Sequence, residues 1–178
     1  DAPLCNASTS TVWIDHAAAQ YDVAKRTVVD NNCRRILYIS GKENDYVTEE
    51  RLRGMEKLRD ELNLDMGVKC GSLSELKARN ITMEFGEGYD AVICASDLMA
   101  IGAMKALTEM DIFRPVCGFD GIILMGYVGK QMNTVRQNFA GLSATAMEEL
   151  QKLMNGKEGE DVRTPYSLDR MKYMDIIC

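Results

Sequence analysis

Short apolar runs alternate along this chain with amphipathic stretches, and that alternation limits the possible folds more than any other feature. Runs typical of buried strands cover residues 35–40, 66–71, 90–96 and 114–120. Amphipathic stretches follow the first three runs, with apolar residues recurring every three or four positions as in a helix. Because such a succession requires right-handed crossovers, we predict an α/β fold with a doubly wound parallel sheet and helices on both faces.

The expected helices are recognised by their end signals as well as by apolar spacing. They cover residues 16–31, 49–62, 74–85 and 97–110. Thr48 stands in an imperfect capping-box pattern where the second helix should begin, and Asp97 is expected to cap the fourth helix. The pattern changes after Asp120, where a glycine-punctuated apolar segment precedes further elements. We expect one further helix at residues 140–154. Further strands are expected at residues 10–14, 132–137, 162–168 and 172–177.

Charge and cysteine content exclude several classes of function. The formal net charge is −6 and the basic residues are dispersed, so this segment lacks the basic face that DNA binding needs. The six cysteines form no C-x-x-C pair and His16 is the only histidine, so we expect no metal site and no cofactor. Reduced thiols and the lack of a run of about 20 apolar residues predict a cytoplasmic protein without a membrane span.

The sequence offers no recognisable catalytic arrangement. It holds neither a G-x-S-x-G elbow nor a P-loop, and C-G-F-D-G at residues 117–121 is too short for a dinucleotide fingerprint. His16 would have to act alone as a base. We therefore do not expect an enzyme, and a catalyst built on a flavodoxin-like sheet is the least favoured alternative.

Four segments, taken in order, carry a family resemblance. They cover residues 14–41, 50–58, 90–107 and 117–156. Within them stand R-x-x-G beginning at Arg51, S-D-L-M-A-I-G-A beginning at Ser96, and G-F-D ending at Asp120. This order resembles the effector-binding domain of LacI/GalR-family transcription regulators and extends over nearly the whole chain. The resemblance implies the type I periplasmic-binding-protein-like fold, in which two similar lobes are joined by crossovers.

The resemblance further implies that the two lobes are unequally represented. Residues 33–122 and 162–177 would form a complete carboxyl-terminal lobe, whereas residues 1–32 and 130–156 would be a remnant of the amino-terminal lobe. The first strand–helix units of that lobe and a helix-turn-helix segment have no counterpart in the sequence. We therefore expect an N-terminally truncated regulator that reaches DNA only through a segment absent from this chain.

The resemblance also implies a ligand site at the carboxyl ends of the strands, where open α/β sheets bind ligands. Arg51 matches an arginine that grips a sugar hydroxyl or an effector carboxylate, a task that suits the guanidinium fork. Asp120 matches a carboxylate that accepts hydrogen bonds from the ligand, and Ser96 matches a polar residue just before a helix. The alternatives are a surface helix arginine paired with neighbouring glutamates and a structural turn cap at Asp120.

Four further residues match positions near the family ligand. Asp45 follows the strand that Gly41 closes, and Gln137 matches a cleft-facing residue on a crossover strand. Leu73 stands where sugar-binding relatives often place an aromatic ring, and Asp15 matches an acid at the end of an amino-lobe strand. A solvated loop acid at Asp45 and a structural hinge role for Asp15 are equally good interpretations.

The fourth helix and the apolar run after Asp120 resemble the dimer face of the family's carboxyl-terminal lobe. Consecutive apolar residues around glycine cannot all point into one core, so burial by a partner is expected. The alternative is an ordinary buried helix turn. The predicted homodimer interface consists of Ile101, Met104, Ile122, Ile123, Met125 and Tyr127.

Together these observations predict a small-molecule sensing domain of a LacI-type transcription regulator. A sugar or related metabolite would bind between the lobes and shift their relative angle, which the intact regulator would transmit to its DNA-binding segment. The ligand can shift the lobes only by the difference between its affinities for their open and closed states. A solute-binding protein of a transport system is one alternative. The same sensor fused to another output domain is a second.

Overall fold

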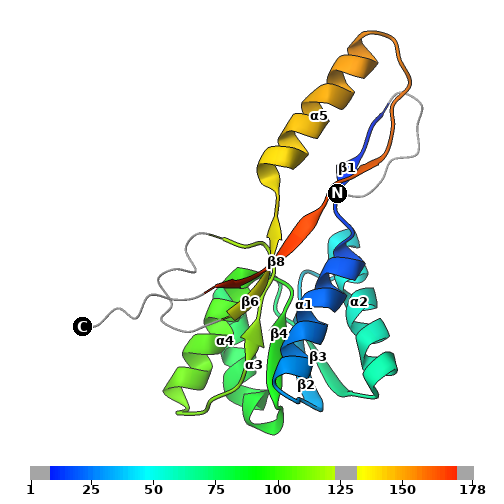
Figure 1. Ribbon diagram of the computed structural model, residues 1–178. Coiled ribbons are helices and arrows are strands. Elements are labelled where there is room, and N and C mark those ends of the chain that lie inside the picture. Colours follow the sequence, from blue (N-terminus) through cyan, green and yellow to red (C-terminus); the bar gives the residue numbers. More distant parts are fainter. Residues whose placement is uncertain (1–8, 123–131, 172–178) are drawn as a thin grey trace.

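A six-stranded sheet forms the centre of the molecule in the computed structural model, which describes residues 9–122 and 132–171 (Figure 1). Its order is β3-β2-β4-β5-β6-β8. The strands are β2 (Arg35–Ser40), β3 (Asp65–Cys70), β4 (Ala91–Cys94), β5 (Val116–Cys117), β6 (Met132–Gln137) and β8 (Tyr166–Met171). The strands from β3 to β6 pair in parallel, which confirms the predicted doubly wound sheet, whereas β8 runs antiparallel to β6 at one edge.

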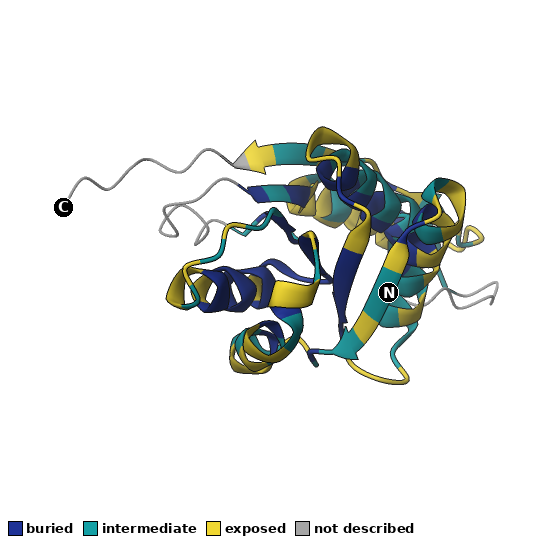
Figure 2. Cartoon of the chain, turned by 90° about the horizontal axis from the view of Figure 1, so that it is seen from below, coloured by how far each residue is buried: buried dark blue, intermediate teal, exposed yellow. Residues whose placement is uncertain are grey.

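Helices cover both faces of this sheet. Their bounds are α1 (His16–Asp30), α2 (Tyr46–Leu62), α3 (Glu75–Phe85) and α4 (Asp97–Glu109), with a short 3-10 turn η1 (Gly86–Gly88) after α3. Helix α1 packs against α2, and α3 packs against α4. Buried residues gather on the strands and the inward helix faces (Figure 2), and β4 is buried throughout, as expected for a parallel strand covered on both sides.

Each helix pair approaches closely at a glycine. A Cβ atom added to Gly54 of α2 would lie 2.2 Å from the carbonyl oxygen of Ala17 in α1. A Cβ atom added to Gly102 of α4 would lie 2.1 Å from the carbonyl oxygen of Glu75 in α3. These distances are far below van der Waals contact, so the packing of both layers depends on glycine at these two positions.

A smaller unit projects from the central body (Figure 1). It consists of β1 (Val12–Trp13), which pairs in parallel with β7 (Val162–Arg163), and α5 (Phe139–Met154), which packs against β1. The chain passes between this unit and the body after β1, after β6 and after β7. The chain thus crosses three times between the body and the smaller unit.

The predicted lobe boundaries are wrong for two elements. Residues 1–32 and 130–156 were assigned to the amino-terminal lobe, yet α1 packs on α2 and on the large sheet, and β6 is a strand of that sheet. The physical reason is the buried face of α1, where Val23, Ala24 and Val28 fill the space above the sheet. The strand expected at 172–177 lies outside the described residues.

Helix starts match the predictions unevenly. Helix α3 begins after Ser74, as expected, and the Ser74 side chain accepts a hydrogen bond from the backbone N–H of Lys77. Helix α2 begins three residues earlier than predicted, because Asp45 rather than Thr48 is its N-cap. The Oδ2 atom of Asp45 accepts a hydrogen bond from the Thr48 backbone N–H at 2.9 Å, so Thr48 belongs to the first turn of the helix.

Candidate ligand-binding site at the carboxyl ends of the strands

A pocket of about 250 Å³ opens beside the carboxyl ends of β2, β4 and β5. It is lined by Gly41, Asp45, Val47, Thr48, Arg51, Leu73, Ala95 and Asp120. This edge of an open α/β sheet is the usual place for a ligand, because the connections diverge there. The structure thus brings Arg51, Asp120, Asp45 and Leu73 together, although they are distant in sequence.

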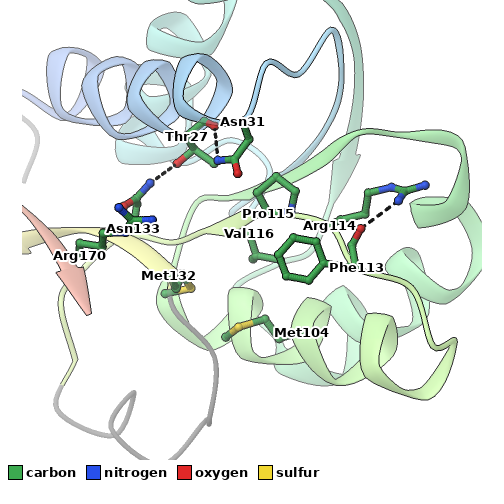
Figure 3. Close-up of a pocket in the computed structure, with 10 residues that line it drawn as sticks. All are labelled: Thr27, Asn31, Met104, Phe113, Arg114, Pro115, Val116, Met132, Asn133 and Arg170. Atoms are coloured by element: carbon green, nitrogen blue, oxygen red, sulfur yellow. Dashed lines mark hydrogen bonds between the residues drawn. The ribbon is translucent and has the colours of Figure 1, made fainter. Parts of the chain in front are cut away.

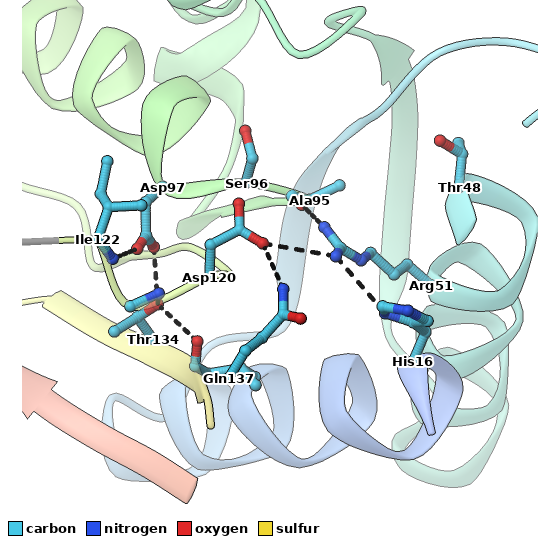
Figure 4. Close-up of polar contacts among 12 residues, drawn as sticks. His16, Thr48, Arg51, Ala95, Ser96, Asp97, Asp120, Ile122, Thr134 and Gln137 are labelled. Atoms are coloured by element: carbon cyan, nitrogen blue, oxygen red, sulfur yellow. Dashed lines mark hydrogen bonds and ion pairs between the residues drawn. The ribbon is translucent and has the colours of Figure 1, made fainter. Parts of the chain in front are cut away.

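Arg51 is the centre of the polar contacts in this pocket (Figure 4). Its side chain is buried, and one guanidinium nitrogen (Nη1) donates to the carbonyl oxygen of Ala95. The other (Nη2) lies 3.5 Å from Asp120 Oδ1 and 3.5 Å from His16 Nδ1. The guanidinium carbon stands 3.6 Å from the centroid of the Phe119 ring, a cation–π arrangement. The alternative of a surface arginine paired with nearby glutamates is therefore wrong.

Asp120 holds an unusual backbone conformation at the same place. Its φ is 114°, a region that favours glycine and costs other residues about 1–3 kcal/mol. Its Oδ1 accepts a hydrogen bond from Gln137 Nε2 at 2.9 Å and faces Arg51, while no described residue donates to Oδ2. Burial raises the pKa of Asp120, and the Arg51 charge and the Gln137 hydrogen bond act against that rise. Gln137 therefore contacts Asp120, although it does not itself line the pocket.

Neither Ser96 nor Asp97 has the role that the sequence predicted. Ser96 is the N-cap of α4, because its Oγ accepts from the Met99 backbone N–H at 3.3 Å, and it does not line the pocket. Asp97 is buried and accepts from Thr134 Oγ1 at 2.7 Å and from the Ile122 backbone N–H at 2.9 Å. Burial raises the pKa of Asp97 to about 6 despite these donors. Asp97 therefore ties α4 to β6 and to the loop after β5.

The remaining predicted residues lie at the margins of the site. Asp45 is occupied by its hydrogen bonds from Thr48, yet it lines the pocket. Asp15 caps α1 and forms an ion pair with Arg163 at 3.2 Å, which joins two of the three crossings and supports the hinge interpretation. Leu73 is 39% exposed at the pocket edge and adopts a left-handed backbone conformation.

The predicted dimer residues are only partly available to a partner. Ile101 and Met104 are buried within this chain, so their assignment to the interface is wrong; this face of α4 packs on α3 and the sheet. Ile122 is half-buried, and large apolar residues are exposed on the two helices of this layer, Leu98 on α4 and Leu76 on α3. The other predicted interface residues lie outside the described part of the chain, namely Ile123, Met125 and Tyr127.

His16 is a site residue that the sequence analysis did not identify as one. Its ring is 3% exposed at the start of α1, and burial, followed by the Arg51 charge, lowers its pKa from 6.5 to about 4. The only sequence signal is its place directly after the capping residue Asp15.

We expect His16 to titrate with a midpoint near pH 4 when its ring protons are followed by NMR, because the charged form is disfavoured by burial. As the only histidine, it gives a single unambiguous titration curve. Arg51→Ala should raise the midpoint by removing a neighbouring positive charge, whereas Arg53→Ala, an exposed arginine on the same helix, should leave it unchanged. A wild-type midpoint at or above 6 would contradict the buried placement.

The described residues hold neither a group of metal-binding side chains nor a membrane-spanning helix. Across residues 9–122 and 132–171, no three His, Cys, Asp or Glu side chains are grouped to hold a metal ion. No helix in these ranges has the length and apolar character needed to cross a membrane. The cysteines of this part of the chain, Cys33, Cys70, Cys94 and Cys117, are free thiols.

Comparison with known proteins gives the class of this chain. The family model of the periplasmic binding protein-like domain matches residues 26–169, so the chain belongs to that family. Among curated proteins it is 24% identical over 159 residues to the HTH-type transcriptional repressor PurR of Aliivibrio fischeri (strain MJ11), covering 83% of this chain and 47% of that relative. It is 26% identical over 139 residues to the HTH-type transcriptional regulator AscG of Escherichia coli (strain K12), covering 72% and 41%.

These relatives confirm the predicted resemblance to LacI-family regulators, and the chain spans about half of their length. Solved structures share its fold. A LacI family transcriptional regulator from Enterococcus faecium with bound ribose matches with a TM-score of 0.84 at 18% identity, covering 97% of this chain and 68% of that chain. A periplasmic solute-binding protein of an ABC transporter from Actinobacillus succinogenes with bound D-allose matches with a TM-score of 0.82 at 22% identity, covering 91% and 61%.

Proposed function

We propose that this chain is the effector-sensing part of a LacI-type transcription regulator and that its pocket binds a sugar or a related small metabolite. The observation that carries the proposal is the Arg51–Asp120 pair at the carboxyl edge of the sheet, with Arg51 Nη2 3.5 Å from Asp120 Oδ1. The Phe119 ring packs against the Arg51 guanidinium, and Gln137 donates a hydrogen bond to Asp120. The curated relatives named as repressors and the sugar-bound structures of the same fold support it. The proposed activity is binding without chemical conversion of the ligand.

The pair provides complementary groups for a polyhydroxylated ligand. Arg51 supplies guanidinium donors whose orientation is fixed by Ala95 and Phe119, so little side-chain entropy is lost on binding. Asp120 Oδ2 is open to accept from a ligand hydroxyl. The Arg51–Asp120 contact is long, so a ligand hydroxyl between the two side chains could form a shorter hydrogen bond with each of them. Such hydrogen bonds are stronger in a pocket from which water is excluded.

The same pair provides a route from ligand to hinge. Gln137, which donates to Asp120, is the last residue of β6 before the chain crosses into the smaller unit. His16, beside Arg51, directly follows another crossing. A ligand that favours one arrangement of Arg51 and Asp120 therefore favours one lobe angle, by its difference in affinity for the two states. DNA binding would reside in a segment outside this chain. The regulator would be a cytoplasmic homodimer, and the exposed Leu98 and Leu76 would belong to the dimer contacts.

We expect Arg51→Ala to abolish sugar binding, because it removes the buried donors of the pocket. The measurement is ¹⁵N NMR of this chain titrated with D-ribose, D-allose and cellobiose, with at least one sugar shifting the amides of Gly41, Leu73 and Asp120. Arg53→Ala is the matched control, since Arg53 lies on the same helix with its side chain 68% exposed. No response to any of the sugars, or equal binding by Arg51→Ala, would contradict the site assignment.

A solute-binding protein of a transport system is the second candidate, because a sugar-bound protein of that kind shares the fold. The two candidates differ in what the gene encodes before Asp1. A helix-turn-helix favours the regulator, whereas a secretory signal favours the transport protein. The repressors among the curated relatives favour the first.

A further inference from the structure

A second pocket, of about 360 Å³, lies at the amino ends of β5 and β6 (Figure 3). It is lined by Thr27, Asn31, Met104, Phe113, Arg114, Pro115, Val116, Met132, Asn133 and Arg170. We propose that this pocket binds a small α-hydroxy carboxylic acid with an apolar substituent, and that it does so independently of the Arg51–Asp120 site. Its volume lies within the range of about 300–1,000 Å³ that is usual for small-molecule sites.

The two pockets lie at opposite ends of the same strand. Met132 and Asn133 open β6 at the second pocket, whereas Gln137 closes β6 beside Asp120. Because a strand rises about 3.3 Å per residue, about 13 Å of β6 separates Asn133 from Gln137. No described lining residue is common to the two pockets, so we expect that one ligand can occupy each at the same time.

One side of the second pocket is apolar. The Met104 and Met132 side chains face it from α4 and β6, together with Pro115 and Val116 at the start of β5 (Figure 3). The Phe113 ring stands at its edge and is 78% exposed, a large apolar surface left without cover by the described residues. Methionine side chains adapt to irregular shapes, so this side suits an aromatic or branched aliphatic group.

The charge of the pocket selects an anion. Among the described residues that line it, Arg114 and Arg170 are the ionisable ones and none is a carboxylate, although the whole chain carries a net charge of −6. Arg114 is already engaged, since it donates to the carbonyl oxygens of Tyr89 at 2.6 Å and Phe113 at 2.9 Å. Arg170 is exposed and forms no ion pair with any described residue, so its guanidinium is free to bind a carboxylate.

An unpartnered acceptor lies next to that guanidinium. Asn133 pairs directly with Arg170 across β6 and β8, so the two side chains leave the sheet on the same face. Asn133 Nδ2 donates to Thr27 Oγ1 at 3.0 Å, which fixes the amide, and its buried Oδ1 has no hydrogen-bond partner among the described residues. A hydroxyl on the carbon next to a carboxylate would serve Asn133 and Arg170 together, after a small movement of the Asn133 amide.

The test is titration of this chain with mandelate, followed by NMR of ¹³C-methyl-labelled methionines. Mandelate should shift the methyl signals of Met104 and Met132 and leave that of Met55, which is buried at α2, in place. Mandelamide, which lacks the charge, should bind at least about tenfold more weakly, and phenylacetate, which lacks the hydroxyl, about threefold more weakly. These ratios separate the contribution of Arg170 from that of Asn133.

Arg170 and Arg53 are exposed, so their replacement should keep the fold intact in this test. Arg170→Gln should weaken mandelate binding to the level of mandelamide, while Arg53→Gln, the matched exposed arginine, should not. Arg51→Ala should leave mandelate binding unchanged, since Arg51 belongs to the other pocket. Absence of shifts at Met104 and Met132, equal binding of mandelate and mandelamide, no effect of Arg170→Gln, or loss of binding in Arg51→Ala would each overturn the proposal.

Discussion

Gly102→Ala should lower the free energy of unfolding by about 2–3 kcal/mol, because the added methyl group must separate two packed helices. The new Cβ would lie 2.1 Å from the carbonyl oxygen of Glu75 and 3.1 Å from the backbone nitrogen of Arg79, and neither backbone atom can turn away. Alanine gains helix propensity of up to about 1 kcal/mol over glycine, which offsets only part of this cost. Urea unfolding measures the loss as a lower midpoint at constant slope.

The matched control is Gly88→Ala, since no atom lies within 4 Å of a Cβ at that position. It should change the free energy of unfolding by less than about 0.5 kcal/mol, as for most surface substitutions. Gly54→Ala should behave like Gly102→Ala, because its Cβ meets the Ala17 carbonyl oxygen at 2.2 Å. Equal stability of the Gly102 and Gly88 variants would show that α3 and α4 do not approach as described.

Asp97→Asn should change how stability depends on pH. The folded-state pKa of Asp97 is raised from 3.8 to about 6 by burial, so the native state binds its proton more tightly than the unfolded state. Ionised Asp97 therefore destabilises the fold above pH 6, and this effect disappears as the pH falls toward 4. The difference is worth about 3 kcal/mol at pH 7, and the gap between wild type and Asp97→Asn in urea unfolding should change by about 2–2.5 kcal/mol between pH 7 and pH 4.

His16 produces the opposite dependence in almost the same window. Its folded-state pKa is lowered to about 4, so the stability it contributes is complete above pH 6.5 and is lost as the pH falls toward 4. Because the Asp97 effect is opposite in sign to the His16 effect, Asp97→Asn should lose more stability than wild type as the pH falls from 7 to 4. A variant profile parallel to that of wild type would contradict the raised pKa of Asp97.

The strands and helices were predictable because their signals are local. The apolar run at 90–96 could only be a strand covered on both faces, and Ser74 combined an acceptor with the start of an amphipathic stretch. The cap of α4 was assigned to Asp97 instead of Ser96 because both residue types are good N-caps, and the choice depends on which residue has an extended backbone. In the structure that residue is Ser96, with φ −153° and ψ 158°.

The non-local features could not be read from the sequence. The antiparallel pairing of β8 depends on a crossing from the smaller unit, and no residue of 166–171 encodes its direction. The lobe boundary at residue 32 came from the family pattern, whereas the buried face of α1 determined where that helix packs. For the site, Arg51 and Asp120 came from motifs, but the contribution of His16 arises only from the packing of α1 beside α2.

The helix α5 (Phe139–Met154) differs from every other helix in how little it buries. Only Glu149 is buried along its length, while Phe139, Met147, Leu150 and Met154 are exposed. Its packing against β1 therefore contributes little apolar burial to the cooperative unfolding of the main sheet. Hydrogen exchange along α5 is accordingly governed by local opening, at a free-energy cost well below that of global unfolding. We therefore expect two regions of different thermodynamic stability, and the more labile of them begins after Gln137, whose side chain donates to Asp120.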